Sequence, residues 1–142
     1  MKPQSAAFLE KARTLPGDAQ TMLDVDLTDA AGRTAYLAGF HAAQALVFET
    51  RGRVFKTHSG IRAEFALLVK DDPRVDSELR GFLGLTYQLK AIADYESGPG
   101  SKVSVETARA ALQTAYRFVE CVTDLISANG TAPGAPGAEP SS

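Results

Sequence analysis

The hydrophobic pattern along this chain repeats with the period of an α-helix. In the first segment, apolar side chains recur three and four residues apart, which predicts an amphipathic helix over about residues 5–25. Pro16 and Gly17 fall inside this segment without shifting the apolar phase, so we expect a kink or a short break there. The apolar positions are Phe8, Ala12, Leu15, Ala19 and Met22.

The second segment, residues 28–51, is apolar on almost every side. From residue 35 to residue 48 only Gly39, His41 and Gln44 are not apolar, which is typical of a helix that is buried over most of its surface. The run is too short and too interrupted to span a membrane, which takes about 20 predominantly apolar residues. We therefore interpret it as the central helix of a bundle.

One face of this central segment carries polar side chains. At 100° per residue, Arg33, His41 and Gln44 fall within an arc of about 80°. One interpretation is a polar seam whose members bond to neighbouring helices, with His41 as a satisfied core histidine. The alternative is that the seam borders a pocket or a subunit contact.

Three more helices are predicted, joined by short connections. Ser59 is expected to cap a third helix, which ends before Pro73 because a proline disfavours helix in the residue that precedes it. A fourth helix spans about residues 77–96, where Gly81 and Gly84 are expected to let another helix approach closely.

Capping residues mark the ends of the second and fifth helices. Thr28 or Asp29 is expected to cap the start of the second helix, and Gly52 is expected to end it. Ser104 is expected to cap the fifth helix. The inward positions of that helix are Ala108, Leu112, Ala115, Val119, Val122 and Ile126.

These elements predict an all-α fold, an antiparallel up-and-down bundle of four to five helices, since no stretch alternates convincingly with period two. With 142 residues, 44% of them hydrophobic, the chain is long enough for one domain over residues 1–128. A Pro/Gly/Ala-rich tail over residues 129–142 is expected to be disordered. The single cysteine, Cys121, allows no intramolecular disulfide. We expect a cytoplasmic protein, because no apolar signal-peptide region is visible near the start.

The densest local charge lies in residues 51–62, where basic side chains and a histidine occur without an intervening acid. The net charge of −2 gives no global signature for nucleic acid, so such binding would need a local patch like this one. Cations beside an aromatic such as Phe55 suit phosphate and base contacts, and a helix N-terminus suits an anion. The alternative is a solvated loop whose cations balance nearby acids. The charged positions are Arg51, Arg53, Lys56, His58 and Arg62.

Four segments in this order resemble the HEPN domain superfamily, in its branch of small stand-alone bacterial and archaeal proteins: GRTAYLAGFHAAQAL, KTHSG, KAIADYE and SVETARAAL. The resemblance covers about residues 5–127. It implies an antiparallel helical bundle, commonly a homodimer, often encoded beside a minimal nucleotidyltransferase in toxin–antitoxin-like pairs. Many members of the superfamily are metal-independent ribonucleases with an Arg, four to six residues, and then a His at the dimer cleft.

The resemblance implies that the catalytic pair of that family is altered in this chain. Arg53 and His58 fit the spacing, but they lie in the loop after the second helix, whereas the family motif aligns with KAIADYE. There Lys90 stands at the Arg position and Tyr95 at the His position. Lysine lacks the bidentate fork of arginine, and a tyrosine of ordinary pKa, about 10, is a poor base. Asp94 is expected to pair with a cation such as Arg33 or Lys56, or to contribute to function with Tyr95.

The leading hypothesis is a homodimer that binds RNA or a nucleotide, is catalytically degenerate, and partners a minimal nucleotidyltransferase. One alternative is a metal-independent endoribonuclease toxin that uses Arg53 and His58, in which the ribose 2′-OH supplies the nucleophile. Another is a purely structural helical interaction module. We expect no metal, no cofactor and no membrane contact. The proposed RNA- or nucleotide-binding residues are Arg53, Lys56, Thr57, His58, Ser59, Lys90 and Tyr95.

Overall fold

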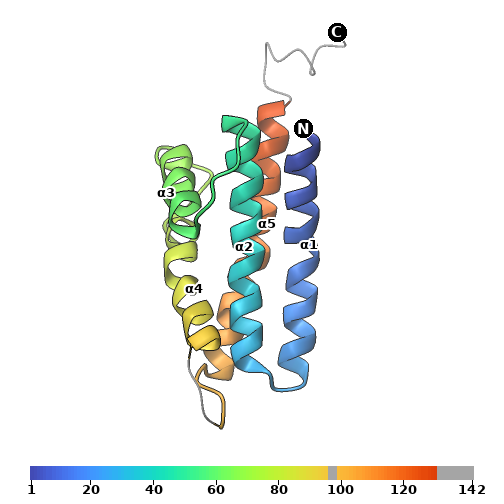
Figure 1. The fold of residues 1–142 in the computed structure, drawn as a ribbon, viewed down its shortest axis with the longest axis vertical. Coiled ribbons are helices and arrows are strands. Elements are labelled where there is room, and N and C mark those ends of the chain that lie inside the picture. The colour runs from blue at the N-terminus through green and yellow to red at the C-terminus, as the bar shows by residue number, and fades with distance from the viewer. Residues whose placement is uncertain (96–98, 131–142) are drawn as a thin grey trace.

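The computed structural model describes residues 1–95 and 99–130, and this part of the chain is a bundle of five α-helices without strands (Figure 1). The predicted all-α class is therefore confirmed. From residue 131 onward, the tail predicted for residues 129–142 lies outside the described residues. In chain order the helices are α1 (Pro3–Asp24), α2 (Thr28–Arg51), α3 (His58–Val69), α4 (Ser77–Tyr95) and α5 (Val105–Gly130).

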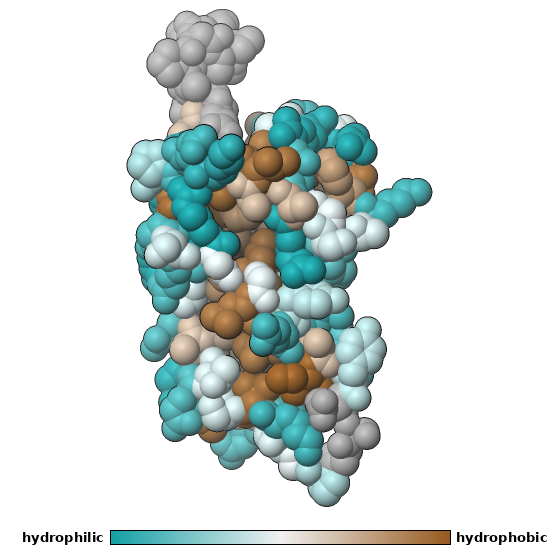
Figure 2. Space-filling model, turned by 90° about the vertical axis from the view of Figure 1, so that its left-hand side faces the viewer, coloured by the Kyte–Doolittle hydropathy of each residue, from teal (hydrophilic) through white to brown (hydrophobic). Residues whose placement is uncertain are grey.

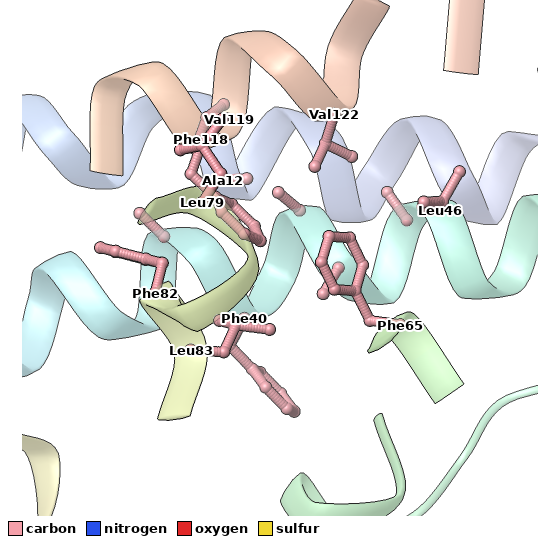
Figure 3. Close-up of a cluster of buried hydrophobic side chains, with 14 of the residues drawn as sticks. Ala12, Phe40, Leu46, Phe65, Leu79, Phe82, Leu83, Phe118, Val119 and Val122 are labelled. Carbon is pink, nitrogen blue, oxygen red and sulfur yellow. The ribbon is translucent and has the colours of Figure 1, made fainter. Parts of the chain in front are cut away.

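The helix α2 lies at the centre of the bundle, as its all-round apolar pattern predicted. It packs against each of the other four helices. In Figure 1, α1 and α5 lie to one side of α2, and α3 and α4 lie to the other. Figure 3 shows the core between them, to which every helix contributes a labelled side chain, such as Ala12, Leu46, Phe65, Phe82 and Phe118. Burial of these apolar groups is the main favourable term for the fold.

The helix α1 continues through Pro16 without a break. A proline inside a helix removes one backbone hydrogen bond and crowds the preceding turn. The unshifted apolar phase nevertheless keeps both halves of α1 on the same core, since Leu9, Ala12 and Ala19 are all buried, as is Pro16 itself. The short break that we considered is therefore absent.

Two predicted caps were wrong. Thr57, not Ser59, caps α3, and its Oγ1 accepts the Gly60 N–H at 2.9 Å. No side chain caps α2, whose N-cap is Leu27. Asp29 instead accepts the Val103 N–H at 2.8 Å and ties the start of α2 to the segment before α5, a long-range use of the carboxylate that local spacing does not reveal.

Two other predicted ends match the structure. Gly52 ends α2 in the left-handed conformation with φ of 74°, which glycine adopts without strain. Ser104 Oγ accepts the Thr107 N–H at 3.0 Å and caps α5. The inward positions predicted for α5 are all buried.

The glycines that allow close packing are on α2 rather than on α4, which corrects our prediction. A Cβ at Gly81 or Gly84 of α4 would meet nothing within 4 Å. A Cβ at Gly39 of α2 would instead overlap the Phe82 ring of α4, and one at Gly32 would come within 3.3 Å of the Leu89 side chain. The close approach of α2 and α4 therefore depends on the central helix.

The outer face of α3 and α4 is mainly hydrophilic but interrupted by apolar patches (Figure 2). Leu67 of α3 is 61% exposed and Leu85 of α4 is 70% exposed. Leu85 borders a groove of about 380 Å³ between α4 and α5. Across the described part of the chain, no helix has the length and apolar content that a membrane span requires.

Candidate functional site

His58 is the first residue of α3, and its side chain turns into the bundle. The Thr57 cap sets the start of the helix at this point. The His58 ring stacks on Phe40 of α2, with 4.0 Å between the ring centroids and 11° between the planes. The imidazole is therefore held against the central helix and is not displayed on the loop.

A buried tyrosine hydroxyl determines where this imidazole carries its proton. Tyr36 of α2 is fully buried, and its hydroxyl lies 2.8 Å from His58 Nδ1. Burial raises the pKa of Tyr36 to about 12, so the hydroxyl keeps its proton and donates to Nδ1. The neutral ring then carries its own proton on Nε2, which makes Nε2 a hydrogen-bond donor.

Two cations gather on a second tyrosine beside His58. The Tyr87 ring of α4 lies 6.2 Å from the His58 ring, centroid to centroid. Arg62 Cζ lies 4.2 Å from the Tyr87 centroid, and Lys90 Nζ lies 5.9 Å from it. A cation over an aromatic face is attracted by the negative potential of the ring. Arg62 Nε is buried and has no hydrogen-bond partner among the described residues.

The carboxylate of Asp94 joins Lys90 to a further cation, Arg33 of α2. Asp94 Oδ1 accepts from Arg33 Nε at 2.7 Å, and Asp94 Oδ2 accepts from Lys90 Nζ at 2.6 Å. The hydrogen bond from Lys90, and then that from Arg33, lowers the pKa of Asp94, so it stays ionised at neutral pH. The side chain of Lys90 is 16% exposed and that of Arg33 is 43% exposed, so the group reaches the surface.

These residues form a unit that we call the inner cluster. It combines four rings with three permanent cations and one carboxylate, contributed by α2, α3 and α4. Its members are Tyr36, Phe40, His58, Tyr87, Arg33, Arg62, Lys90 and Asp94.

Burial, together with the nearby cations, lowers the pKa of His58 and keeps its ring neutral at neutral pH. Burial is the largest cause that lowers the pKa of His58, and the charges of Lys90 and Arg62 lower it further, whereas Asp94 opposes them. The cluster therefore offers cations and a neutral imidazole that donates from Nε2. This combination suits an anion such as a phosphate, which accepts hydrogen bonds and carries negative charge.

The basic side chains of residues 51–57, which we call the outer loop, are arranged differently. Arg51 forms an ion pair with Glu64 of α3. Arg53 Cζ lies 4.2 Å from the centroid of Phe55 in its own loop. Lys56 is exposed. Each of these cations therefore meets a local partner or solvent, and they do not converge on one point.

The structure does not bring Arg53 to His58. Arg53 borders a small hollow together with Phe8 and Phe48, on the side of α1. His58 instead lies against Phe40, inside the inner cluster. The two residues thus have the spacing of the family motif in sequence but face different surroundings.

The other predicted site residues divide between the inner cluster and the surface. Arg33 pairs with Asp94, whereas His41 and Gln44 pair with each other, His41 Nδ1 to Gln44 Oε1, at 2.6 Å. Tyr95 at the end of α4 is 78% exposed. Of the polar seam, only Arg33 therefore contributes to the inner cluster. Ser59 is exposed, and Thr57 acts as the helix cap.

Sequence reasoning missed Tyr36 and Tyr87. Both occupy positions in helical apolar patterns, where an aromatic usually indicates packing, and nothing near them in the sequence signals a polar role. Arg62 was grouped with the outer loop by proximity, although it acts with α4. Within residues 1–95 and 99–130, no three His, Cys, Asp or Glu side chains lie close enough together to share a metal ion.

Comparisons with known proteins bear on this arrangement. A search of curated proteins returned no match to the chain. The family profile described as the HEPN domain matches residues 5–125, from the first turn of α1 to the last turns of α5. The matched region covers most of the chain and contains the whole inner cluster. The chain therefore belongs to the HEPN domain family.

Proposed function

We propose that this HEPN protein binds RNA or a nucleotide by its phosphate at the inner cluster, without cleaving it. The observation that carries the proposal is the gathering of three cations in the inner cluster: Arg33 and Lys90 pair with Asp94, and Arg62 lies over the Tyr87 ring that Lys90 also faces. Like charges brought together at a surface cost free energy unless something compensates them, and an anionic ligand does so.

The surroundings of these cations also suit a nucleic acid. The first turn of α3, which begins at His58, presents backbone N–H groups and the positive end of the helix dipole. His58 Nε2 adds one more donor. Aromatic side chains provide surfaces on which bases stack in many single-strand-binding proteins, and the exposed ring of Tyr95 lies at the end of the same helix as Lys90.

The geometry supports binding rather than cleavage. A general base needs a free lone pair, but the hydrogen bond from Tyr36 occupies Nδ1 of His58 and leaves the proton on Nε2. Arg53, which the ribonuclease alternative requires, borders a hollow with Phe8 and Phe48 and is not part of the inner cluster. Lys90, at the family's Arg position, is a point charge without a bidentate fork.

The proposal includes a homodimer and a minimal nucleotidyltransferase as partner, which the family resemblance implies. The proposal places the dimer contact on the face of α3 and α4, where the exposed side chains of Leu67 and Leu85 would be covered on association. Light scattering coupled to size exclusion measures the mass in solution. A monomer at micromolar concentration would contradict the dimer without affecting the phosphate site.

The phosphate site is tested by fluorescence anisotropy with a labelled single-stranded RNA of about 12 nucleotides at low salt. We expect Lys90→Ala to weaken binding about five- to tenfold, since each phosphate contact made by a cation contributes strongly at low salt. Lys70→Ala removes an exposed lysine beyond the end of α3 and is the matched control, expected to change affinity less than twofold.

Two results would overturn the proposal. One is that the wild-type protein fails to bind RNA at low salt, and the other is that Lys90→Ala and Lys70→Ala behave alike. Incubation of the RNA with EDTA and protein tests the absence of cleavage. Strand scission that disappears in His58→Ala would show instead a metal-independent ribonuclease.

A further inference from the structure

Asp94 lies in a position that helix stability does not explain. It is the penultimate residue of α4, where the negative end of the helix dipole disfavours a carboxylate. Its partner Lys90 is four residues earlier, and this order of acid and base is the less favourable one along a helix. The carboxylate is held there by Lys90 and by Arg33 of α2, each on its own oxygen.

The position of Asp94 has a consequence for any anion that enters the inner cluster. The carboxylate repels the ligand in proportion to the negative charge that the ligand carries. For exposed charges about 6 Å apart in a water-like dielectric, this repulsion lowers affinity roughly threefold for each unit of ligand charge. Asp94 therefore penalises a doubly charged ligand more than a singly charged one.

Phosphate groups of RNA and of free nucleotides differ in this respect. A phosphodiester within a strand carries one negative charge. A terminal phosphate monoester carries about 1.5 to 2 negative charges at pH 7, because its second pKa is about 6. Three cations without Asp94 would favour the monoester, and the carboxylate reduces that advantage.

We propose that Asp94 is a specificity-determining residue that shifts the inner cluster from terminal phosphate monoesters toward the internal phosphodiesters of an RNA strand. Arg33 and Lys90 stay paired with it, and Arg62 is the cation whose charge no carboxylate offsets directly among the described ion pairs. The inference rests on the proposed function, because it assumes that phosphate binds at the inner cluster.

The test compares two ligands that share one nucleoside and differ at the phosphate, by one methyl group and by the charge. AMP carries a terminal monoester, and its O-methyl ester carries a diester on the same base and sugar. Each competes with labelled RNA for the protein at pH 7.5. We expect Asp94→Asn to raise the affinity for AMP roughly tenfold and for the methyl ester roughly threefold, so that the AMP-to-ester affinity ratio rises about threefold.

Asp18→Asn is the matched control. It changes the net charge of the protein by the same amount, but Asp18 is exposed on α1, across the bundle from α4 (Figure 1). We expect it to leave the AMP-to-ester ratio unchanged. Asp94→Ser must shift the ratio in the same direction as Asp94→Asn, and thermal unfolding checks that each variant is folded.

The outcomes separate this inference from the proposed function. If labelled RNA does not bind to the wild-type protein, the proposed function is wrong and the inference is wrong with it. If RNA binds, but Asp94→Asn and Asp94→Ser leave the ratio as Asp18→Asn does, the phosphate site stands and the role of Asp94 is overturned.

Discussion

Two groups of cations in this protein differ both in their spacing along the sequence and in what surrounds them in the structure. Those of the outer loop, including Arg53 and Lys56, follow one another closely in the chain, yet each meets a local partner or solvent. Those of the inner cluster come from three different helices, yet they meet around one carboxylate and one tyrosine ring. Proximity in sequence therefore does not show which cations gather in the structure.

The difference has a physical basis in what holds each side chain. A loop cation in water is screened by salt and keeps most of its rotamer freedom, so fixing it on a ligand costs entropy. Arg62 and Lys90 are already constrained by the Tyr87 ring and by neighbouring helices. A preorganised group loses less freedom when it binds, which supports the proposed phosphate site at the inner cluster.

The largest expected effect comes from disturbing the contact that positions α4 over α2. In Gly39→Ala, the added Cβ overlaps the buried Phe82 ring, and overpacking of this kind costs about 1–3 kcal/mol. Because the overlap with the ring is severe, we take the upper end of this range, about 3 kcal/mol. The gain in helix propensity offsets about 1 kcal/mol, so we expect a loss of about 2 kcal/mol in the free energy of unfolding, measured by urea denaturation. RNA affinity is expected to fall as well, since Tyr87 and Lys90 belong to α4.

Gly81→Ala is the control for this variant. It makes the same substitution in the exposed face of α4, where a Cβ meets nothing within 4 Å. We expect it to stabilise the protein by about 0.5–1 kcal/mol, because alanine has the higher helix propensity. If the two variants changed stability in the same direction, the close approach at Gly39 would not be what positions α4.

The second-largest expected effect is on RNA affinity, when one cation is removed from the inner cluster or from the outer loop. We expect Arg62→Ala to weaken RNA binding about tenfold, or about 1.4 kcal/mol. We also expect the slope of log affinity against log salt concentration to become shallower by about one. Arg53→Ala is expected to weaken binding less than twofold. Anisotropy titrations between 20 and about 200 mM salt measure both quantities. If Arg53→Ala lost more RNA affinity than Arg62→Ala, the phosphate site would lie at the outer loop and not at the inner cluster.

The fold was predictable from sequence because its signals are local. Apolar spacing placed all five helices, and the inward face of α5 was predicted residue by residue. Caps were less reliable, since Thr57 and Ser59 both suit an N-cap and only the helix geometry selects Thr57. Asp29 shows the same limit, because its partner Val103 is distant in sequence.

The site was only partly predictable, because its geometry depends on packing between helices. His58, Lys90 and Arg33 were identified from residue type, spacing and the family resemblance. Tyr36 and Tyr87 occupy positions like those of any core aromatic, and their polar role exists only where α2 and α4 meet His58. A single sequence carries no signal for such a juxtaposition.

A smaller effect isolates the hydrogen bond between Tyr36 and His58 within the inner cluster. Tyr36→Phe removes the buried hydroxyl that donates to His58 Nδ1 and leaves the ring in place. We expect a loss of about 1 kcal/mol in the free energy of unfolding, the usual contribution of one buried hydrogen bond. Tyr116→Phe, at a tyrosine of α5 that is 49% exposed, is the control and should change stability by less than about 0.5 kcal/mol. Equal effects would mean that the Tyr36 hydroxyl is not engaged.

The smallest effect compares the two histidines as the pH falls. Burial is the largest cause that lowers the pKa of both His41 and His58 below 6.5. Between 6.5 and the folded pKa, the unfolded chain binds more protons than the folded one, so the free energy of unfolding decreases as the pH is lowered from about 7.5 to 5.5. NMR titration of the two imidazoles should give both midpoints below 6.5. Bound RNA should raise only the His58 midpoint, because a phosphate beside the ring stabilises its charged form. If RNA raised the titration midpoint of His41 instead, the phosphate would bind beside His41 in the polar seam of α2, outside the inner cluster.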